Sequence, residues 1–535
     1  MSQLSTYRRL FIPAFFIGYL LVGCAILPDF GMSWDEAAQR NHGIVAFDYI
    51  NEVLDLGFEK QRPQSHLLRH SARHYGLWFP LLGYGLEQLL GLSENFRGRF
   101  LMRHYLVFFL FWGASIAFYR LLFLRFGDRK TALAGTGLFI LSPRIFGHAF
   151  FNPKDIVFLA TYTISTYTLL KFLKEKNIRA ALLHALACAF VVNTRIPGVL
   201  IPAITVGILF VEWGQARFNV QRMRAFLPAL VSFFVATPAF IFTLNPALWH
   251  APAQQFGETF RTMSHFDWSN VLLYRGQFIK ATELPWHYIP TWIAITTPPP
   301  FLALFAIGMA FLLRSVFQSI SKGRLWRNAN ERTDLILFGL FFLPLAAIIL
   351  KKSTLYDGWR QMFFVYPAFA GVATVGVFRL IKSRPGRRFR RVVWVFLLAG
   401  IGYAGAQIIQ IHPFEYVYFN TFAGKEVFFK FERDYWGLSY KQAIETLAAK
   451  HPYSCATVKM QHYPGEENFR FLGPDIRQHL ELRYGPEPAE FRISNYRGWK
   501  EMGDLKHRRH FYNHEVLILT AQGEPVVGIY RDPDY

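Results

Sequence analysis

The 535-residue chain has little cysteine, and its cysteines follow no recognisable pattern. Its three cysteines, Cys24, Cys188 and Cys455, are scattered, and two of them lie in apolar runs. The absence of a disulfide framework and of a CxxC site excludes a disulfide-stapled domain and dithiol chemistry. The two thiols in apolar runs are expected to behave as small core residues.

Metal-binding spacings are also missing. The chain has 17 histidines, and His66, His70 and His74 stand at helical spacing. No HExxH or comparable zinc spacing occurs, however. We therefore expect neither a protein-bound metal nor another cofactor, with a divalent ion kept as the alternative.

Acidic residues are scarce, because 36 Asp and Glu stand against 58 Lys and Arg, for a net charge of +22. Such a balance can indicate nucleic-acid binding. Here the basic residues concentrate in short connectors between apolar runs, at 125–130, 171–179, 217–224, 314–332 and 379–391. The positive-inside rule of membrane proteins produces this distribution. We therefore expect membrane lipids as partners and no nucleic acid.

Hydrophobic residues make up 52% of the chain, and they form runs of about 20 residues, long enough to cross a bilayer. The first run follows Arg8-Arg9 without a small-x-small cleavage pattern, which favours an uncleaved signal anchor. Eleven spans are predicted, near residues 10–27, 101–124, 131–147, 155–173, 180–194, 197–213, 226–244, 290–313, 334–350, 358–379 and 392–411.

An eleven-span count puts all five basic connectors on the side of the N-terminus. This agreement predicts a multi-pass protein of the bacterial inner membrane, with its N-terminus in the cytoplasm and its C-terminal tail in the periplasm. Three long segments then lie outside, at 28–98, 245–289 and 412–535.

The outer segments contain structure of their own. Residues 37–56 predict an amphipathic helix at the membrane surface, and 75–92 predict a second surface helix or a short re-entrant one. In the tail, 414–436 is aromatic and basic, which suits a layer on lipid headgroups. A helix at 438–450, a strand at 455–460 and a hairpin over 516–530 follow.

We therefore predict an all-α polytopic membrane domain over residues 1–411. A small periplasmic α/β domain would occupy residues 412–535.

Charged and polar residues gather where the spans end on the outer side. Acidic side chains at that depth are unfavourable, so they usually have a function. Cations on the outer side oppose the positive-inside bias. Binding of an anion such as a lipid phosphate would explain them. The residues are Asp35, Glu36, His148, Asn152, Lys154, Asp155, Arg195, Lys351, Lys352, Tyr356, Asp357 and Arg360.

Simpler explanations stand beside this one. Asp35 is well placed to cap the helix that follows it. Asp155, after Pro153, is suited to the first turn of a helix. Lys351 and Lys352 are suited to snorkel from the end of a span toward the interface.

The set of residues fits sugar transfer from a polyprenyl phosphate. Such a reaction needs a base for the acceptor hydroxyl and positive charge for the departing phosphate. It needs no acid at the leaving group, because a lipid phosphate leaves as an anion. We expect the catalytic acids to be Asp35 as base, Glu36 and Asp155. The donor phosphate would contact Arg195, Lys351, Lys352 and Arg360, and the substrate would contact His148, Asn152, Lys154, Tyr356 and Asp357.

Short motifs occur in a characteristic order along residues 1–410. They are Trp34-Asp35-Glu36, NPKD at 152–155, PWHY at 285–288 with TTPP at 296–299, and YDGWRQM at 356–362 before Tyr366-Pro367. This order resembles the GT-C superfamily of integral membrane glycosyltransferases. The chain looks most similar to the bacterial branch related to protein O-mannosyltransferases and lipid A aminoarabinose transferases. The tail, at 412–420 and 434–440, is similar to a segment of uncharacterised bacterial members.

The resemblance implies a polyprenyl-phosphate-linked sugar donor, transfer at the periplasmic face and inversion at the anomeric carbon. It implies that Asp35 is the base and that Asp155 is a second carboxylate of the site. One departure is that Pro153 and Lys154 stand where related sequences often carry small or apolar residues, which suits a different acceptor.

Other functions remain open at this point. A transporter or flippase of lipid-linked substrates would show two related halves and acids in the middle of its spans, and neither occurs. A non-catalytic envelope assembly factor would tolerate the loss of Asp35. A ligase or polymerase with lipid diphosphate donors would favour more Arg and His than 245–289 carries. The sequence does not identify the sugar, nor whether the acceptor is a protein, a lipid or a glycan.

Overall fold

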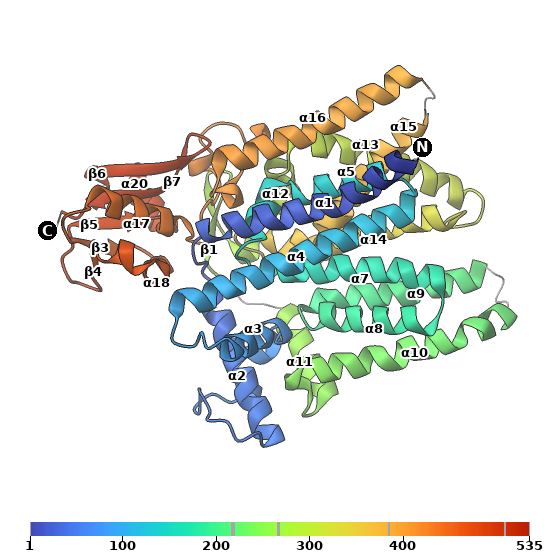
Figure 1. Cartoon of the computed structure of the whole chain (residues 1–535), viewed down its shortest axis with the longest axis horizontal. Coiled ribbons are helices and arrows are strands. Elements are labelled where there is room, and N and C mark those ends of the chain that lie inside the picture. Colours follow the sequence, from blue (N-terminus) through green and yellow to red (C-terminus); the bar gives the residue numbers. More distant parts are fainter. Residues whose placement is uncertain (1, 216–219, 265–267, 384–385, 508–509, 534–535) are drawn as a thin grey trace.

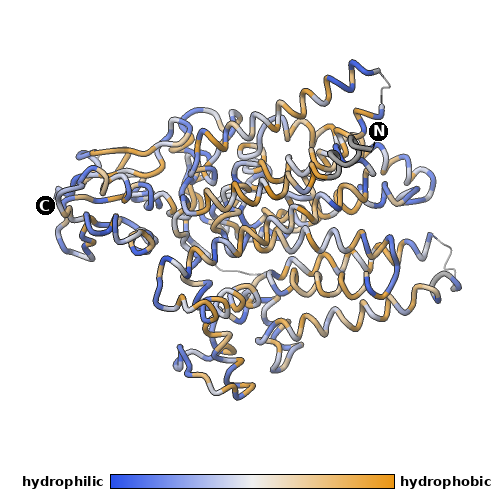
Figure 2. The backbone as a smooth tube through the Cα atoms, viewed as in Figure 1, coloured by the Kyte–Doolittle hydropathy of each residue, from blue (hydrophilic) through white to orange (hydrophobic). Residues whose placement is uncertain are grey.

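The computed structural model describes residues 2–215, 220–264, 268–383, 386–507 and 510–533. Long helices run side by side through most of the molecule, and a small sheet domain lies at one end of them (Figure 1). The N-terminus lies at the opposite end of the helical bundle (Figure 1). Apolar residues line the helices, whereas hydrophilic residues are frequent at both ends and in the sheet domain (Figure 2).

Within the described residues, nine helices are long and apolar enough to cross a membrane. The chain is therefore a multi-pass membrane protein, as predicted. These helices are α1 (Ser2–Ile26), α4 (Phe96–Phe126), α7 (Asp155–Glu175), α9 (Leu200–Gln215), α10 (Val220–Leu244), α13 (Pro299–Ile320), α14 (Ala329–Lys351), α15 (Tyr366–Ser383) and α16 (Arg387–Ile411).

Two of the eleven predicted spans are broken. The span predicted at 131–147 consists of α5 (Arg129–Ile140) and the short α6 (Pro143–His148). The span predicted at 290–313 consists of α12 (Tyr288–Thr296) and α13. In both cases a proline begins the second helix, because its missing N–H is tolerated in a first turn but not in a helix interior. Helix α8 (Ile178–Val192) is apolar but shorter than the nine.

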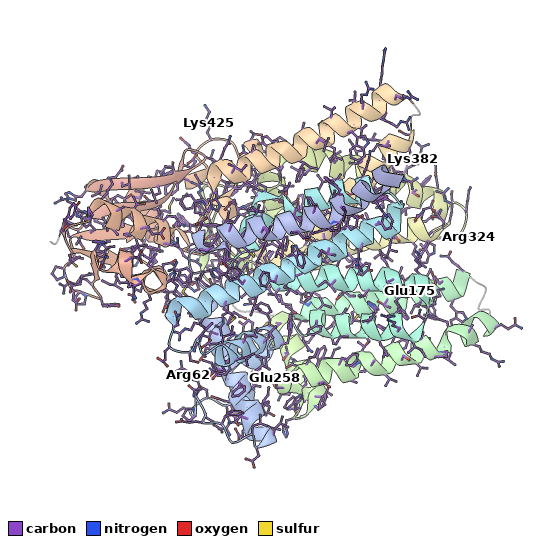
Figure 3. The ribbon with its side chains drawn as sticks, viewed as in Figure 1. Arg62, Glu175, Glu258, Arg324, Lys382 and Lys425 are labelled. Atoms are coloured by element: carbon purple, nitrogen blue, oxygen red, sulfur yellow. The ribbon has the colours of Figure 1, made fainter. Side chains whose placement is uncertain are left out.

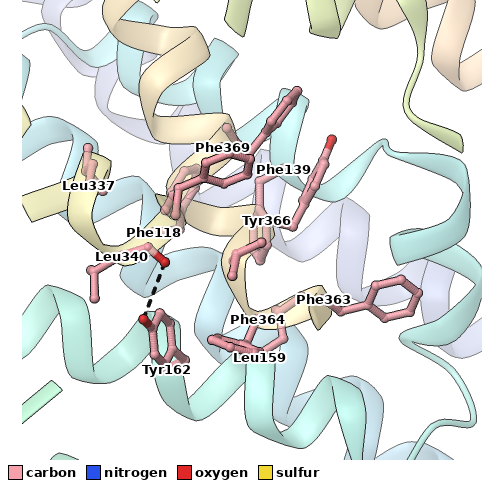
Figure 4. Close-up of a cluster of buried hydrophobic side chains, with 14 of the residues drawn as sticks. Phe118, Phe139, Leu159, Tyr162, Leu337, Leu340, Phe363, Phe364, Tyr366 and Phe369 are labelled. Carbon is pink, nitrogen blue, oxygen red and sulfur yellow. Dashed lines mark hydrogen bonds between the residues drawn. The ribbon is translucent and has the colours of Figure 1, made fainter. Parts of the chain in front are cut away.

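The core of the bundle is built around α15, which packs against α13, α5 and α14. A Cβ atom on Gly308 of α13 would lie 2.0 Å from the carbonyl oxygen of Val372, and one on Gly376 would lie 2.6 Å from that of Leu304. The two helices therefore touch backbone to backbone, as small residues allow in membranes. Aromatic side chains of α15, such as Phe369 and Tyr366, belong to a cluster of buried hydrophobic side chains in this core (Figure 4).

Arg324 and Lys382, which belong to two of the basic connectors, lie at the end of the bundle that carries the N-terminus (Figure 3). Arg62 and Lys425 lie at the opposite end, beside the extramembrane elements (Figure 3). These elements are α2 (Glu36–Leu54), α3 (Trp78–Leu89), α11 (Pro252–Ser264) and the hairpin of β1 (Val271–Tyr274) and β2 (Gln277–Lys280).

Helices α2 and α3 thus occupy the two segments that were predicted to be helical. His66 and His70 lie in short 3-10 turns rather than on an α-helix, and their Nδ1 atoms accept backbone N–H groups two residues on.

The C-terminal domain holds a five-stranded sheet in the order β4-β3-β5-β7-β6. The predicted helix, strand and hairpin are confirmed as α17 (Ser439–Lys450), β3 (Ala456–Met460), and β6 (Glu515–Ala521) with β7 (Glu524–Arg531). Strands β4 (Leu480–Leu482) and β5 (Phe491–Ser494) run parallel to β3, and β7 runs antiparallel to β5 and β6. Helices α18 (Gly465–Phe471), α19 (Pro474–Arg477) and α20 (Trp499–Lys506) complete the domain.

The segment 414–436 differs from its prediction as a layer on lipid headgroups. Tyr416, Tyr418 and Trp436 are buried, and the 3-10 turn at 415–417 packs against α6. Most of its aromatic residues therefore belong to the packed interior between the bundle and the sheet domain, whereas Phe422 and Phe429 are exposed.

Candidate active site

A buried arginine, Arg360, connects three acidic side chains from separate parts of the chain. Its Nη1 lies 3.1 Å from Asp155 Oδ2 and 3.7 Å from Asp35 Oδ2. Its Nη2 lies 3.2 Å from Asp357 Oδ2. Rings hold the guanidinium as well, with Trp436 at 4.7 Å and Tyr356 at 4.9 Å from its Cζ. The structure therefore brings together residues that the sequence predicted to meet at the outer ends of the spans.

Asp155 is the most fully engaged of the three acids. It is buried at the first residue of α7, where Arg195 Nη2 lies 2.6 Å from its Oδ1. Asn152 donates to its Oδ2 over 3.0 Å and accepts its backbone N–H over 2.8 Å. With two arginines and an amide around it, Asp155 is suited to orient cations rather than to accept a proton.

Asp35 has a different environment. It occupies the N-cap position of α2, but its side chain makes no capping hydrogen bond. The structure therefore does not support a helix-capping role for the Asp35 side chain. Its side chain is 21% exposed. Within the described part of the chain, Oδ2 is buried without a hydrogen-bond partner. Asp35 thus keeps an acceptor oxygen available at the edge of a cationic cluster.

Glu36 was also predicted to be a catalytic acid, but both of its carboxylate oxygens contact other groups of the protein. Its carboxylate is 1% exposed, and Oε1 accepts the backbone N–H of Ser33 over 2.6 Å. Oε2 lies 2.8 Å from Nε2 of His104 on α4. Glu36 therefore fixes the turn that carries Asp35. No pattern in the sequence marks His104, a single histidine within a long apolar helix.

Lys154 provides a cation without a carboxylate partner. Its Nζ lies 4.4 Å from the ring centre of Tyr75, and it forms no ion pair with an acid among the described residues. Burial lowers the pKa of Lys154 to about 8, with Arg195 and Arg360 acting in the same direction and Asp35 opposing them. An anion that reached Lys154 would relieve this repulsion.

His148 and Tyr356 support the site. The ring of His148 is buried, with Nδ1 3.2 Å from Asn152 Nδ2, so that it orients the amide that holds Asp155. Tyr356 stacks on Trp268, with ring centres 4.3 Å apart. Neither position requires direct contact with a substrate.

Lys351 and Lys352, predicted at the phosphate, are not brought to the cluster. They are exposed at the end of α14, and neither forms an ion pair or a side-chain hydrogen bond with another described residue. Helix α14 continues through Lys351, so both side chains leave from its last turn, as snorkelling side chains do. The chain returns to the cluster only at Tyr356 and Asp357.

Sequence reasoning missed the contribution of the C-terminal domain. Nη2 of Arg497 lies 3.3 Å from Asp357 Oδ1, and its guanidinium carbon lies 4.6 Å from the ring centre of Trp34. Glu432 lies close by, and burial together with the Asp357 charge raises its pKa to about 8. The motif at 434–440 was the one hint that this part of the chain approaches the site.

Two small, narrow cavities adjoin the cluster beside α3. They share the lining residues Gln39, Phe79, Pro80 and Pro153, and Lys154 and Tyr75 line the smaller one. Among the residues that the structure describes, no three His, Cys, Asp or Glu side chains form a group suited to a metal ion.

Comparison with known proteins gives likeness in structure alone. No family model matches the chain, and no curated protein matches it in sequence. Among solved structures, apo ArnT from Cupriavidus metallidurans is similar over 98% of both chains, at 11% identity and a TM-score of 0.47. The same protein bound to undecaprenyl phosphate is similar over 97% of both chains, at 12% identity and a TM-score of 0.46.

Oligosaccharyltransferase AglB from Archaeoglobus fulgidus, in complex with an inhibitory peptide and a dolichol-phosphate, is also similar. The likeness covers 89% of this chain and 62% of AglB, at 11% identity and a TM-score of 0.47. At this level of likeness, a functional assignment has to come from the residues of the site itself.

Proposed function

We propose that the chain is a membrane glycosyltransferase that moves a sugar from a polyprenyl-phosphate donor to an acceptor hydroxyl. One observation carries the proposal. The buried Oδ2 of Asp35 has no hydrogen-bond partner within the described residues and lies 3.7 Å from Arg360, at the edge of a cluster rich in cations. A base with a free oxygen beside groups that hold an anion is what this transfer requires.

The reaction would proceed by direct displacement. The acceptor oxygen forms a bond to the anomeric carbon while the bond from that carbon to the phosphate oxygen breaks. The hydroxyl proton passes to Asp35, and the bonding electron pair leaves with the lipid phosphate. Attack opposite to the leaving group inverts the anomeric carbon.

Asp35 is a better base than Asp155 or Asp357, because arginines occupy both of those acids. Asp155 faces two arginines, and Asp357 is held between Arg360 and Arg497. Protonating either would break those ion pairs inside a buried cluster, which is unfavourable. Asp35 faces a single arginine beyond hydrogen-bond distance, so it can accept a proton at less expense.

The donor phosphate would bind at Lys154 and Arg195. Lys154 has no carboxylate partner among the described residues, and Arg195 has one, Asp155. Lys154 also lines a small cavity beside α3 whose walls are mostly apolar, which suits a phosphate that carries an apolar tail. Arg360, held by three acids, would orient Asp35 rather than bind phosphate directly.

The order of motifs that resembles the GT-C superfamily supports the same function. The basic connectors at the other end of the bundle favour a cytoplasmic N-terminus in a bacterial inner membrane, with the site on the periplasmic face. Residues 1–411 would form the catalytic membrane domain and 412–535 the periplasmic one.

The test uses cells from which the gene is deleted. If the proposal holds, these cells accumulate a polyprenyl-phosphate sugar that mass spectrometry identifies, and the wild-type chain clears it. Asp35→Asn should fail to clear it at equal membrane abundance. Asp55→Asn, at an exposed acid following α2, serves as the matched control and should behave as wild type. Clearance by Asp35→Asn would favour an assembly factor or flippase.

A further inference from the structure

We propose that the C-terminal domain helps to form the catalytic site. Asn468 positions the segment that carries Asp35, and Arg497 positions Asp357, the acid that orients Arg360. This inference rests on the proposed function and assigns the domain a role within it. Both residues act through others, so they are positioning residues.

The backbone before Asp35 is held by the C-terminal domain. The buried Asn468 accepts the backbone N–H of Met32 over 2.8 Å and donates to the carbonyl oxygen of Met32 over 2.9 Å. Two residues later, the N–H of Trp34 donates to the carbonyl oxygen of Trp436 over 3.1 Å. The segment thus pairs with the C-terminal part of the chain directly before the proposed base.

The approach is too close for a side chain at Gly31. A Cβ atom there would lie 2.4 Å from Asn468 Oδ1 and 2.6 Å from the carbonyl oxygen of Leu438. Real Cβ atoms do not come so close to such atoms, and one of them is backbone. The sequence therefore keeps a glycine where the two parts of the chain meet.

The side chain of Trp34 is held from the same domain. Its ring is 37% exposed, yet the guanidinium of Arg497 lies over it at 4.6 Å and the ring of Tyr463 meets it edge-on at 5.0 Å. An indole between a cation and an aromatic edge has a defined orientation. Since Asp35 follows Trp34 directly, this orientation also fixes where Asp35 stands.

Arg497 reaches the cluster by a second route. It donates to the backbone carbonyl of Tyr435, while its Nη2 lies 3.3 Å from Asp357 Oδ1. The other oxygen of Asp357 binds Arg360. Without Arg497, Asp357 would interact with Arg360 alone and draw it away from Asp35 and Asp155.

Arg497 has the surroundings of a positioning residue rather than of a core residue. Its side chain is 25% exposed and lines an open pocket between the β1–β2 hairpin and the C-terminal domain. Shortening or neutralising it therefore removes little packing, so the fold is expected to persist in a variant.

The experiment compares Arg497→Gln with Arg497→Lys and with Arg477→Gln, an exposed arginine of the same domain. Clearance of the accumulated lipid-linked sugar is measured at equal membrane abundance. We expect Arg497→Gln to slow clearance about tenfold or more, because the buried Asp357 loses one of its two arginine partners. Arg497→Lys should restore part of the rate, and Arg477→Gln should match wild type.

A double variant separates positioning from a general structural role. If Arg497 acts through Asp357, then Arg497→Gln combined with Asp357→Asn should be no slower than the worse of the two single variants. Binding of undecaprenyl phosphate to the purified Arg497→Gln protein should stay within about twofold of wild type, because the proposed phosphate residues are unchanged. Rates that fall multiplicatively in the double variant would overturn the route through Asp357.

The outcomes distinguish this inference from the proposed function. Wild-type clearance by Arg497→Gln together with failure of Asp35→Asn overturns the role of the domain and leaves the glycosyltransferase proposal standing. Wild-type clearance by both overturns the proposed function as well. If Arg497→Gln does not reach the membrane, Tyr463→Leu tests the same clamp on Trp34, and an unchanged rate there counts against it.

Discussion

Lys154 is the cation of the site that a phosphate would use most directly, and Lys154→Met removes its charge while keeping a side chain of similar length. No carboxylate among the described residues depends on it, so the variant should fold as wild type. A hydrogen bond to a charged group contributes about 1.5–3 kcal/mol. Loss of that amount weakens binding of undecaprenyl phosphate about 10- to 150-fold.

The pH dependence sharpens this prediction. Burial lowers the pKa of Lys154 to about 8 in the empty site, and a bound phosphate raises it again. Below pH 8 the lysine already carries its charge, so affinity should be constant. Above pH 8 it must take up a proton on binding, and affinity should fall by about tenfold per pH unit. The phosphate monoester itself titrates near pH 6, so its charge stays constant over this range.

The measurement is the dissociation constant of undecaprenyl phosphate from the purified protein in nanodiscs, between pH 7 and pH 9.5. Wild type should show the break near pH 8, and Lys154→Met should bind weakly without a break. Lys425→Met, an exposed lysine at the same end of the molecule, is the matched control (Figure 3). Equal affinity of wild type and Lys154→Met, or a break that persists in the variant, would refute the assignment of Lys154 to the phosphate.

Two further predictions concern stability. Gly31→Ala should lower the unfolding temperature and the rate of transfer, because its Cβ atom would collide with Asn468 and Leu438. Gly85→Ala has open space and should change neither. Equal melting curves for the two variants would contradict the close approach at Gly31. Contacts with Glu415 and Asp29 raise the pKa of His412 to about 9. The charged His412 therefore stabilises the folded protein fully below pH 6.5, and this contribution is lost as the pH rises toward 9. His412→Gln should flatten that part of the stability profile, and an unchanged slope would contradict it.

The parts of the fold that follow from local pattern could be predicted from the sequence. Apolar runs, basic connectors and β-branched strands are properties of neighbouring residues, so the helices, α17 and the final hairpin were found near their observed bounds. The predicted spans failed at Pro143 and Pro299, where a proline outweighs the hydrophobic pattern. The short strand β4, of three residues, carries too little pattern to detect.

The site could be predicted only in part. Asp35, Asp155 and Arg360 were identified because ionisable residues at the ends of spans are unusual whatever their partners. Lys351 also lies at the end of a span, but the direction in which its side chain points depends on how helix α14 packs. Arg497 lies in a polar domain where an arginine is ordinary, and only the folded chain brings it to Asp357.

Adjacent acids in a sequence can have different roles, as Asp35 and Glu36 show. Asp35 and Glu36 are adjacent, and both were predicted to be catalytic acids, with Asp35 as the base. The structure separates them, because Glu36 binds Ser33 and His104 with both oxygens while Oδ2 of Asp35 has no hydrogen-bond partner within the described residues. Tertiary contacts, which no local pattern records, decide which acid is available to a substrate.

The most direct measurement compares binding and turnover in purified Asp35→Asn. With the lipid-linked sugar recovered from deletion cells as donor, its consumption should fall about 10²- to 10⁴-fold, the usual contribution of a general base. The dissociation constant of undecaprenyl phosphate should remain near the wild-type value, because Lys154 and Arg195 are intact. Donor consumption at the wild-type rate by Asp35→Asn would contradict the account.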